Sequence, residues 1–110
     1  MLELAARLNN AIKTSEEYRR YCETLEAVKR NPEQYQAMNA FRRRNFELQS
    51  YDDGVNRYHE INNLGFEFEK VVRDPAIYDF LVAEQMLSRK MTQMYEMIAD
   101  GLDLDYDYME

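Results

Sequence analysis

The two residue types that most often bind metals or act as nucleophiles each occur once in this chain, as His59 and Cys22. His59 stands in HEINN, which begins like the zinc motif His-Glu-x-x-His but has Asn63 in place of the second histidine. The di-iron motif Glu-x-x-His also fails, because the residue three positions earlier is Asn56. We therefore expect His59 to be a surface or partly buried polar residue, and we expect no metal site and no cofactor.

Cys22 falls between Tyr18 and Leu25 on one face of an expected helix. Nothing in the sequence brings the single histidine to it as an activating base, so we interpret the thiol as structural. The chain also lacks a phosphate-binding glycine loop and a Gly-x-Ser-x-Gly elbow. We expect no catalytic residues and a protein that is not an enzyme. One cysteine excludes an internal disulfide and fits a reducing cytoplasm.

Acidic residues gather at the end of the sequence, in DGLDLDYDYME. This stretch carries most of the net charge of -7, so the remainder of the chain is nearly neutral. Its aspartates have the spacing of a calcium loop, but Tyr108 occupies the position that such a loop reserves for glycine. We expect residues 103–110 to form a flexible, solvated tail, and its alternation of acidic and apolar residues suits docking on a basic partner.

Three consecutive arginines, Arg42–Arg44, lie in FRRRNF. On a helix their side chains point about 100° apart, so they do not share one patch. We expect these side chains to be solvated and to pair with nearby glutamates. The alternative function is an RNA-binding accessory factor that uses Arg42–Arg44. Nucleic acid is nevertheless not the expected partner, because phosphate binding rests on accumulated lysine and arginine.

Helices must position these residues, because glycine, proline and β-branched residues are sparse while Glu, Gln, Arg, Leu, Met and Ala are plentiful. Two Asn/Asp-Pro pairs, at residues 31–32 and 74–75, predict helix starts, since proline fits the first helical position and the residue before it can cap. Thr14 and Glu17 have capping-box spacing, which leaves open whether residues 2–30 form one kinked helix or two.

The segment after Pro75 has the most regular pattern, with steps of three and four between apolar residues. It predicts an amphipathic helix of about 26 residues and about 39 Å, which is longer than a compact domain of this size is wide. An exposed apolar edge on such a helix promotes association, so we expect a homodimer. The expected dimer or partner interface consists of Phe80, Glu84, Leu87, Met91, Met94, Tyr95 and Ile98. Whether this stripe is the core of the dimer or a surface for another protein stays open.

Asn45 and Glu84 interrupt predicted apolar stripes. The structural interpretation is an asparagine that fixes the register, a glutamate that pairs with an arginine, or a stripe that faces solvent at these points. The alternative makes Glu84 part of a binding surface. No apolar run is long enough to span a membrane and no signal-peptide pattern begins the sequence, so we expect a cytoplasmic protein without a membrane partner.

The expected fold is all-α, an antiparallel bundle of about four helices with a long C-terminal amphipathic helix, in a single domain over residues 1–102. Three segments also resemble, in order and spacing, the blocks of the YlbF/YmcA/YheA family. They are LAARLNNAIKTSEEYRRY, NPEQYQAMNAFRRRNFELQ and DPAIYDFLVAEQMLSRKMTQMYEMIADGL. The shared pattern is Ser-x-x-Tyr after Leu-Ala and Ala-Ile, an Asn/Asp-Pro helix start, and Ala-Glu-Gln before a long amphipathic helix.

The resemblance implies a bacterial, all-helical protein that is commonly a dimer and has no known catalytic residues. It implies a non-enzymatic regulatory or scaffold protein that acts through helix-mediated protein contacts, linked to bacterial developmental regulation and to complexes that modulate messenger RNA turnover. Some family members bind an iron-sulphur cluster through cysteines. That property does not extend to this chain, because Cys22 is its only cysteine.

Overall fold

The computed structural model describes residues 1–48, 65–105 and 107–109, and all of its regular structure is helical. The prediction of an all-α fold is confirmed. The helices with defined bounds are α1 (Leu2–Lys13), α2 (Glu16–Lys29), α3 (Pro32–Leu48), α5 (Pro75–Ala99) and the short 3₁₀ helix η1 (Asp107–Met109). Residues 65–71 are also helical and lead into α5. The prediction for His59 lies outside the described residues.

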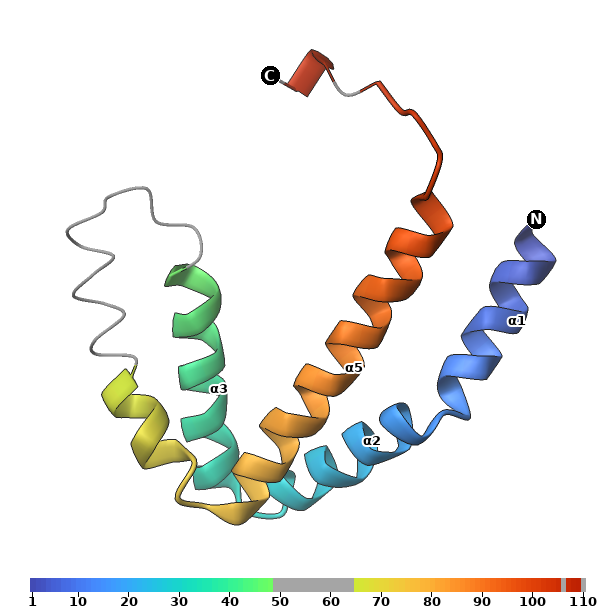
Figure 1. Ribbon diagram of the computed structural model, residues 1–110. Helices are drawn as coiled ribbons and strands as arrows, with labels where there is room; N and C mark the ends of the chain where they lie inside the picture. The colour runs from blue at the N-terminus through green and yellow to red at the C-terminus, as the bar shows by residue number, and fades with distance from the viewer. Residues whose placement is uncertain (49–64, 106, 110) are drawn as a thin grey trace.

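The helices form a V that is one layer thick (Figure 1). One arm contains α3 and the helical residues 65–71, and the other contains α5 with α1 beside its far end. Helix α2 runs along α5 to the point of the V, where the chain turns into α3. The molecule measures 45 × 38 × 16 Å.

The first thirty residues form two helices, which settles the question that the sequence left open. Ser15 adopts an extended conformation between them, and its Oγ accepts a hydrogen bond from the backbone N–H of Tyr18 at 3.2 Å. The predicted cap at Thr14 is wrong. The Thr14 hydroxyl instead lies 3.0 Å from the backbone oxygen of Asn10, to which it donates at the end of α1. The cap falls one residue later because α1 continues to Lys13 and takes Thr14 as its last partner.

Both Asn/Asp-Pro pairs begin helices, as predicted. Asp74 Oδ1 accepts a hydrogen bond from the backbone N–H of Ala76 at 2.9 Å, with Pro75 in the first turn of α5. Asn31 Oδ1 accepts a longer bond of 3.4 Å from the backbone N–H of Gln34. These two starts place the ends of α2, α3 and α5 together and so define the point of the V.

The hydrophobic core lies at this point. Val28, Met38, Ile77 and Phe80 are the fully buried members of one cluster, and they come from α2, α3 and α5. The ring of Tyr21 packs on Phe80 with 5.2 Å between centroids. Helix α1 contributes no buried residue. The packed part of the protein is therefore small, and both arms extend away from it.

Two side chains on expected apolar faces, Cys22 and Asn45, are exposed, and for Asn45 this matches one of the stated alternatives. Cys22 is exposed, so its predicted place on a packed face is wrong. The reason is that α2 packs through Tyr21, Leu25 and Val28, which leaves Cys22 at the edge of that face. Asn45 is exposed as well, so the stripe of α3 faces solvent at this position.

Candidate functional site

No group of three or more His, Cys, Asp or Glu side chains in the described residues could hold a metal ion. Cys22 has an exposed side chain and lies beside Tyr18, one turn away on α2. A side-chain hydrogen bond with Cys22, together with the charge of that thiol when ionised, raises the pKa of Tyr18. The described residues include no histidine that could act as a base toward the Cys22 thiol.

The predicted interface on α5 divides into a covered part and an open part. Phe80 is fully buried in the core, so it belongs to the fold of one chain and is not available to a partner. Leu87 and Met94 are half-buried. Tyr95 and Ile98 are 70% and 62% exposed. The exposure of these side chains increases along α5 because α2 packs against the first half of α5 and does not extend along its second half (Figure 1).

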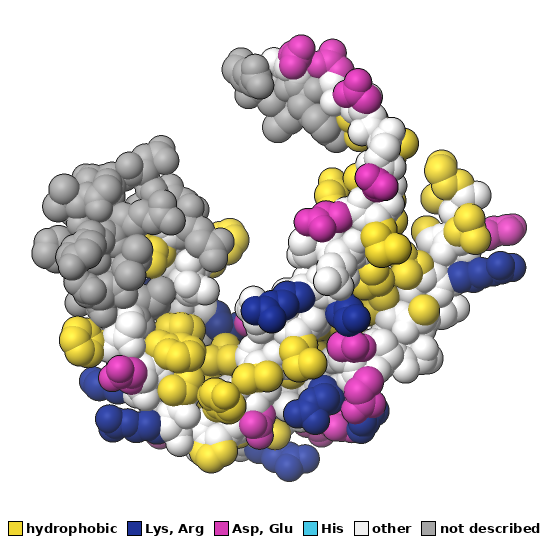
Figure 2. All heavy atoms as spheres, viewed as in Figure 1, with side chains coloured by type: hydrophobic (Ala, Val, Ile, Leu, Met, Phe, Trp, Pro, Cys, Tyr) yellow, Lys and Arg dark blue, Asp and Glu magenta, His cyan; other side chains and the backbone are white. Residues whose placement is uncertain are grey.

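The open part of α5 faces α1 across a shallow apolar groove of about 190 Å³. Its lining includes Leu8 and Ile12 from α1 and Leu87 and Met94 from α5. Figure 2 shows apolar side chains gathered over both helices along this part of the molecule. A helix as short as α1 is marginal in water on its own. It buries no residue here, so this groove is an incompletely covered apolar surface.

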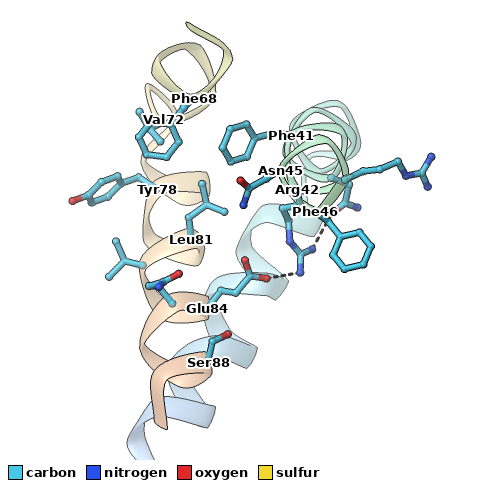
Figure 3. Close-up of a pocket in the computed structure, with 14 residues that line it drawn as sticks. Phe41, Arg42, Asn45, Phe46, Phe68, Val72, Tyr78, Leu81, Glu84 and Ser88 are labelled. Atoms are coloured by element: carbon cyan, nitrogen blue, oxygen red, sulfur yellow. Dashed lines mark hydrogen bonds and ion pairs between the residues drawn. The ribbon is translucent and has the colours of Figure 1, made fainter. Parts of the chain in front are cut away.

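A second and larger depression, the α3/α5 groove, has a volume of about 980 Å³. It is lined by Asn39, Phe41, Arg42, Arg43, Asn45, Phe46, Phe68, Val72, Tyr78, Leu81, Val82, Glu84, Gln85 and Ser88. Figure 3 shows that α3 and α5 supply facing walls, with Phe41 and Leu81 between them. Phe46 is 72% exposed at its edge. The groove combines aromatic and aliphatic walls with a few polar groups, which is the composition of many binding sites.

Arg42 and Glu84 form an ion pair across the base of the α3/α5 groove (Figure 3). Arg42 also donates a hydrogen bond to Asn39 Oδ1 at 3.0 Å and lies over the Phe80 ring, 5.1 Å from its centroid. Both partners of the pair are half-buried. The prediction that Glu84 pairs with an arginine is confirmed, and the pair links α3 to α5 directly beside the core.

The three consecutive arginines point in different directions, as their helical spacing predicted, and two of them form ion pairs with different glutamates within the described residues. Arg44 pairs with Glu67 from the helical residues that precede α5. Arg43 is exposed, lines the α3/α5 groove and has no ion pair within the described part of the chain. Because Arg42 and Arg44 are held by carboxylates, these side chains do not present the accumulated positive charge that nucleic-acid binding needs.

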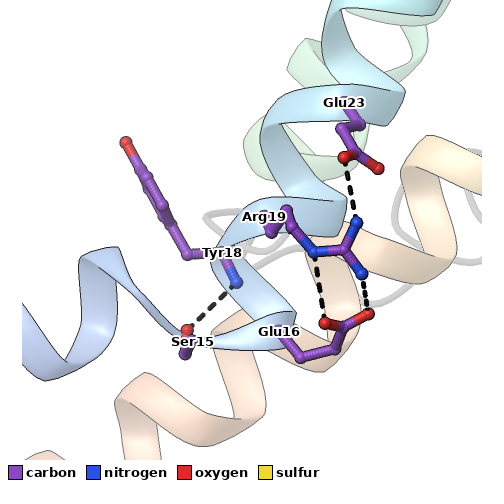
Figure 4. A network of polar contacts seen from close by, with 5 residues as sticks. All are labelled: Ser15, Glu16, Tyr18, Arg19 and Glu23. Carbon is purple, nitrogen blue, oxygen red and sulfur yellow. Dashed lines mark hydrogen bonds and ion pairs between the residues drawn. The ribbon is translucent and has the colours of Figure 1, made fainter.

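A further charged network lies on the outer face of α2 (Figure 4). Arg19 pairs with Glu16 and with Glu23, one turn before and one turn after it. A hydrogen bond and the charge of Glu16, followed by those of Glu23, raise the pKa of Arg19. All of these side chains are exposed, so the network contributes little to stability and serves mainly to keep this face solvated.

The described helices include none that is both long enough and apolar enough to cross a membrane. Among the described residues, the candidate surfaces for function are the open part of α5 with α1, the α3/α5 groove and the acidic tail. The sequence pattern identified the first surface and the tail. It missed the α3/α5 groove, because residues from α3, the preceding helix and α5 are brought together only by the turns at the point of the V.

Comparison with known proteins gives a consistent result over the whole chain. The model of the family described as control of competence regulator ComK, YlbF/YmcA, matches residues 1–103. A curated protein of Symbiobacterium thermophilum, named a UPF0342 protein, is 28% identical over 110 residues, and the match covers 98% of each chain. No solved structure matches this chain. The family name describes regulation and mentions no reaction.

Proposed function

This chain belongs to the YlbF/YmcA family, which is described as controlling the competence regulator ComK. We propose that it is a non-enzymatic regulatory protein that acts by binding other proteins. The observation that carries the proposal is the open part of α5. Met91, Tyr95 and Ile98 are 46%, 70% and 62% exposed on a helix that faces α1, which has no buried residue. Contiguous apolar surface of this kind marks sites of protein association.

A second copy of the chain is the partner that the dimensions favour. The accessible surface is 9256 Å², whereas a compact folded monomer of 13.3 kDa exposes about 6,450 Å². The radius of gyration is 17.6 Å, against about 13 Å for a compact chain of this length. The excess is about 2,800 Å² per chain, or about 5,600 Å² for two chains, which leaves room for an interface of the roughly 2,000–5,000 Å² in total that obligate dimers bury. We propose a homodimer through α1 and the second half of α5.

The dimer would leave other surfaces free for further protein partners, as a regulatory scaffold requires. The family description supports a role in the control of competence. We further propose that the protein acts in the bacterial cytoplasm, in related developmental programmes, through complexes that modulate messenger RNA turnover. The absence of a basic patch among Arg42–Arg44 supports protein contacts as the mode of action, because two of the three arginines are already paired.

Light scattering of purified variants tests the proposed dimer. We expect the wild-type chain to scatter as a dimer and Ile98→Glu to scatter as a monomer with unchanged helical circular dichroism, because Ile98 is exposed and its replacement disturbs no intrachain packing. The matched control is Met97→Glu. Met97 is 76% exposed, and its side chain points about 100° away from that of Ile98, so this variant stays dimeric. A monomeric wild-type chain would contradict the proposal.

Affinity purification from the native host tests the regulatory role. The wild-type chain and both variants are used as bait, and the recovered proteins are identified by mass spectrometry. We expect defined regulatory partners with the wild-type chain and with Met97→Glu. Recovery of no protein by any of the three baits would argue against a scaffold.

A further inference from the structure

We propose that the α3/α5 groove binds an amphipathic helix of another protein, one whose apolar stripe is flanked by acidic side chains. This inference rests on the proposed function, that of a regulator which acts by binding proteins, and deepens it by naming the kind of partner and the surface that holds it. The groove is a part of the molecule that the proposed dimer leaves unused.

The groove and the proposed dimer surface lie on different faces of α5. At about 100° per residue, Met91 and Ile98 fall within about 20° of Phe80 around the helix axis, and α2 packs on that face in the first half of α5. Tyr78 and Gln85, which line the groove, fall about 140–160° from Phe80. A dimer through α1 and the second half of α5 therefore leaves the groove open to another molecule.

The walls of the groove favour a helical occupant. Both long walls are α-helices, α3 and α5, so the backbone N–H and C=O groups along them are hydrogen-bonded within each helix. An extended peptide in this groove would bury its own backbone polar groups without partners, at a cost in free energy for each group. A helix satisfies these groups internally, which makes it the form of peptide that the groove suits.

The dimensions of the groove agree with a helix of about three turns. Along α5 the groove runs from Tyr78 to Ser88, which is about 15 Å of helix. A helix of that length and about 10 Å in diameter occupies about 1,200 Å³, and the groove has a volume of about 980 Å³. Figure 3 shows the two walls facing each other across this space. A partner helix of three turns would therefore lie mostly between α3 and α5.

Exposed aromatic side chains supply the apolar contacts. Phe46, Phe68 and Tyr78 are exposed, and they come from three different segments of the chain. With Phe41 they make four of the fourteen lining residues, more than twice the aromatic share of the whole chain, which is 13%. Aromatic side chains contribute much of the binding energy at protein interfaces. Apolar residues at steps of three and four on the partner helix would pack against them.

Unpaired arginines at the rim select acidic flanks on the partner. Arg42 and Glu84 neutralise each other at the base of the groove. Arg43 lines its edge on α3, and Arg89 lies one turn beyond Gln85 on the same face of α5. Both Arg43 and Arg89 are exposed and have no ion pair within the described part of the chain. A helix in the groove thus has one cation from each wall beside it, and carboxylates on its flanks complement them.

A second copy of this chain offers no helix of that chemistry. The second half of α5 belongs to the proposed dimer surface, and the described tail contains only the short η1. Helix α1 has an uncovered apolar face, but its charged residues are Glu3, Arg7 and Lys13, which leave it net positive. It would bring charge of the same sign to Arg43 and Arg89. A different protein with an acidic amphipathic helix is therefore the occupant that the charges favour.

Two synthetic helices test the groove. Both are stapled peptides of about four turns with leucines at steps of three and four on one face, and the flanking positions are glutamate in one peptide and lysine in the other. We expect the glutamate peptide to shift the amide signals of Phe46, Val82 and Gln85 in the ¹⁵N-labelled protein. We expect it to bind about fivefold more tightly than the lysine peptide, and this preference to fade in about 1 M salt.

Variants of the walls provide the first arm of the test. Val82→Glu places a charge on the apolar wall, and we expect the glutamate peptide to bind about tenfold more weakly. The matched control is Met97→Glu, which lies outside the groove on the same helix and is expected to leave the affinity unchanged. Phe46→Ala on the facing wall is a second variant, because Phe46 is exposed and its truncation disturbs little packing. It is expected to weaken binding about fivefold.

A charge reversal provides the second arm. The double variant Arg43→Glu with Arg89→Glu is expected to reverse the order of the two peptides, so that the lysine peptide binds more tightly. The matched control, Arg20→Glu on α2, is expected to keep the original order. Retention of the glutamate preference in the double variant would overturn the assignment of these arginines as the acidic-selective rim.

Three other results would overturn the inference. The first is the absence of amide shifts in the groove with either peptide at about 1 mM. The second is a set of shifts confined to Met94 and Ile98, because the peptide would then occupy the dimer surface. The third is a lower scattering mass for Val82→Glu, which would assign the groove to a second copy. Light scattering without peptide reports the dimer separately, so a monomeric wild-type chain that binds the glutamate peptide in the groove would overturn the proposed dimer and support this site.

Discussion

At the scale of single residues, Arg42 has the most partners of any described side chain near the core. Its guanidinium binds Glu84 and Asn39 and covers the Phe80 ring. Removing Glu84 leaves a half-buried cation without its counter-charge. We expect Glu84→Ala to lower the free energy of unfolding by about 1–2 kcal/mol, between the values of exposed and of buried pairs. Urea denaturation followed by circular dichroism measures the change.

The exposed pair on α2 supplies the control for this prediction. Glu23→Ala removes a partner of Arg19 in a solvated network, and we expect no measurable change in the free energy of unfolding. Equal losses from Glu84→Ala and Glu23→Ala would show that the position beside Phe80 adds nothing to the pair.

Tyr18 carries a pH-dependent prediction. The hydrogen bond with Cys22, and the charge of that thiol when ionised, raise the pKa of Tyr18. The raised pKa favours the neutral hydroxyl in the folded chain, so its contribution to folding is present below the ordinary tyrosine pKa and is lost as the pH rises through the raised value. NMR titration of ¹³C-labelled tyrosine is expected to show a lower pKa for Tyr18 in Cys22→Ala. Cys22→Ser keeps a hydrogen-bonding group and is expected to retain part of the shift. Identical titrations in all three proteins would contradict the assignment.

At the scale of helices, the two Asn/Asp-Pro starts differ in strength. The bond that Asp74 accepts from Ala76 is 2.9 Å long, whereas Asn31 accepts one of 3.4 Å from Gln34. A charged carboxylate also interacts more favourably with a helix N-terminus. We expect Asp74→Ala to cost about 1 kcal/mol in urea denaturation and Asn31→Ala to cost less. The same ranking is expected in a dimeric and in a dissociated variant, because both caps lie at the point of the V. A larger loss from Asn31→Ala would contradict it.

Most of the helical architecture could be predicted from the sequence, because its signals are local. The caps before Pro32 and Pro75 and the stripe of α5 each depend on residues within a few positions of one another. Even the pairing of Glu84 with an arginine was inferable, because a carboxylate in an apolar stripe needs a partner. The shift of the second cap from Thr14 to Ser15 shows the limit of such signals, since both hydroxyls suit the role.

The sequence could not predict which parts of each apolar face are covered, because that depends on how far the helices diverge. A stripe predicts that a face is apolar, but whether α2 covers Tyr95 as it covers Phe80 depends on the length and angle of α2. Cys22 shows the same effect. The apolar stripe of α2 is wider than the face of α2 that contacts α5, and Cys22 lies outside that face. The α3/α5 groove combines residues from three segments, and no local pattern describes that combination.

At the scale of the whole molecule, the ratio of core to surface is the dominant feature. The fully buried side chains of the described residues gather at the point of the V, while α1 and the second half of α5 remain uncovered. A chain of this shape buries less apolar area than a compact domain, and folding must offset a conformational entropy that scales with the full length. Association is therefore expected to supply part of the stability of the fold.

This coupling predicts that thermal stability depends on protein concentration. If two folded copies unfold to two separate chains, each tenfold rise in concentration adds about 1.4 kcal/mol to the stability of the dimer. For two chains of this length that corresponds to an increase of about 3 °C in the melting temperature. We expect this slope for the wild-type chain and for Met97→Glu in calorimetry, and a lower, concentration-independent melting temperature for Ile98→Glu. A wild-type melting temperature that stays constant with concentration would show that the V is stable alone, and the excess surface would then have to serve partners other than a second copy.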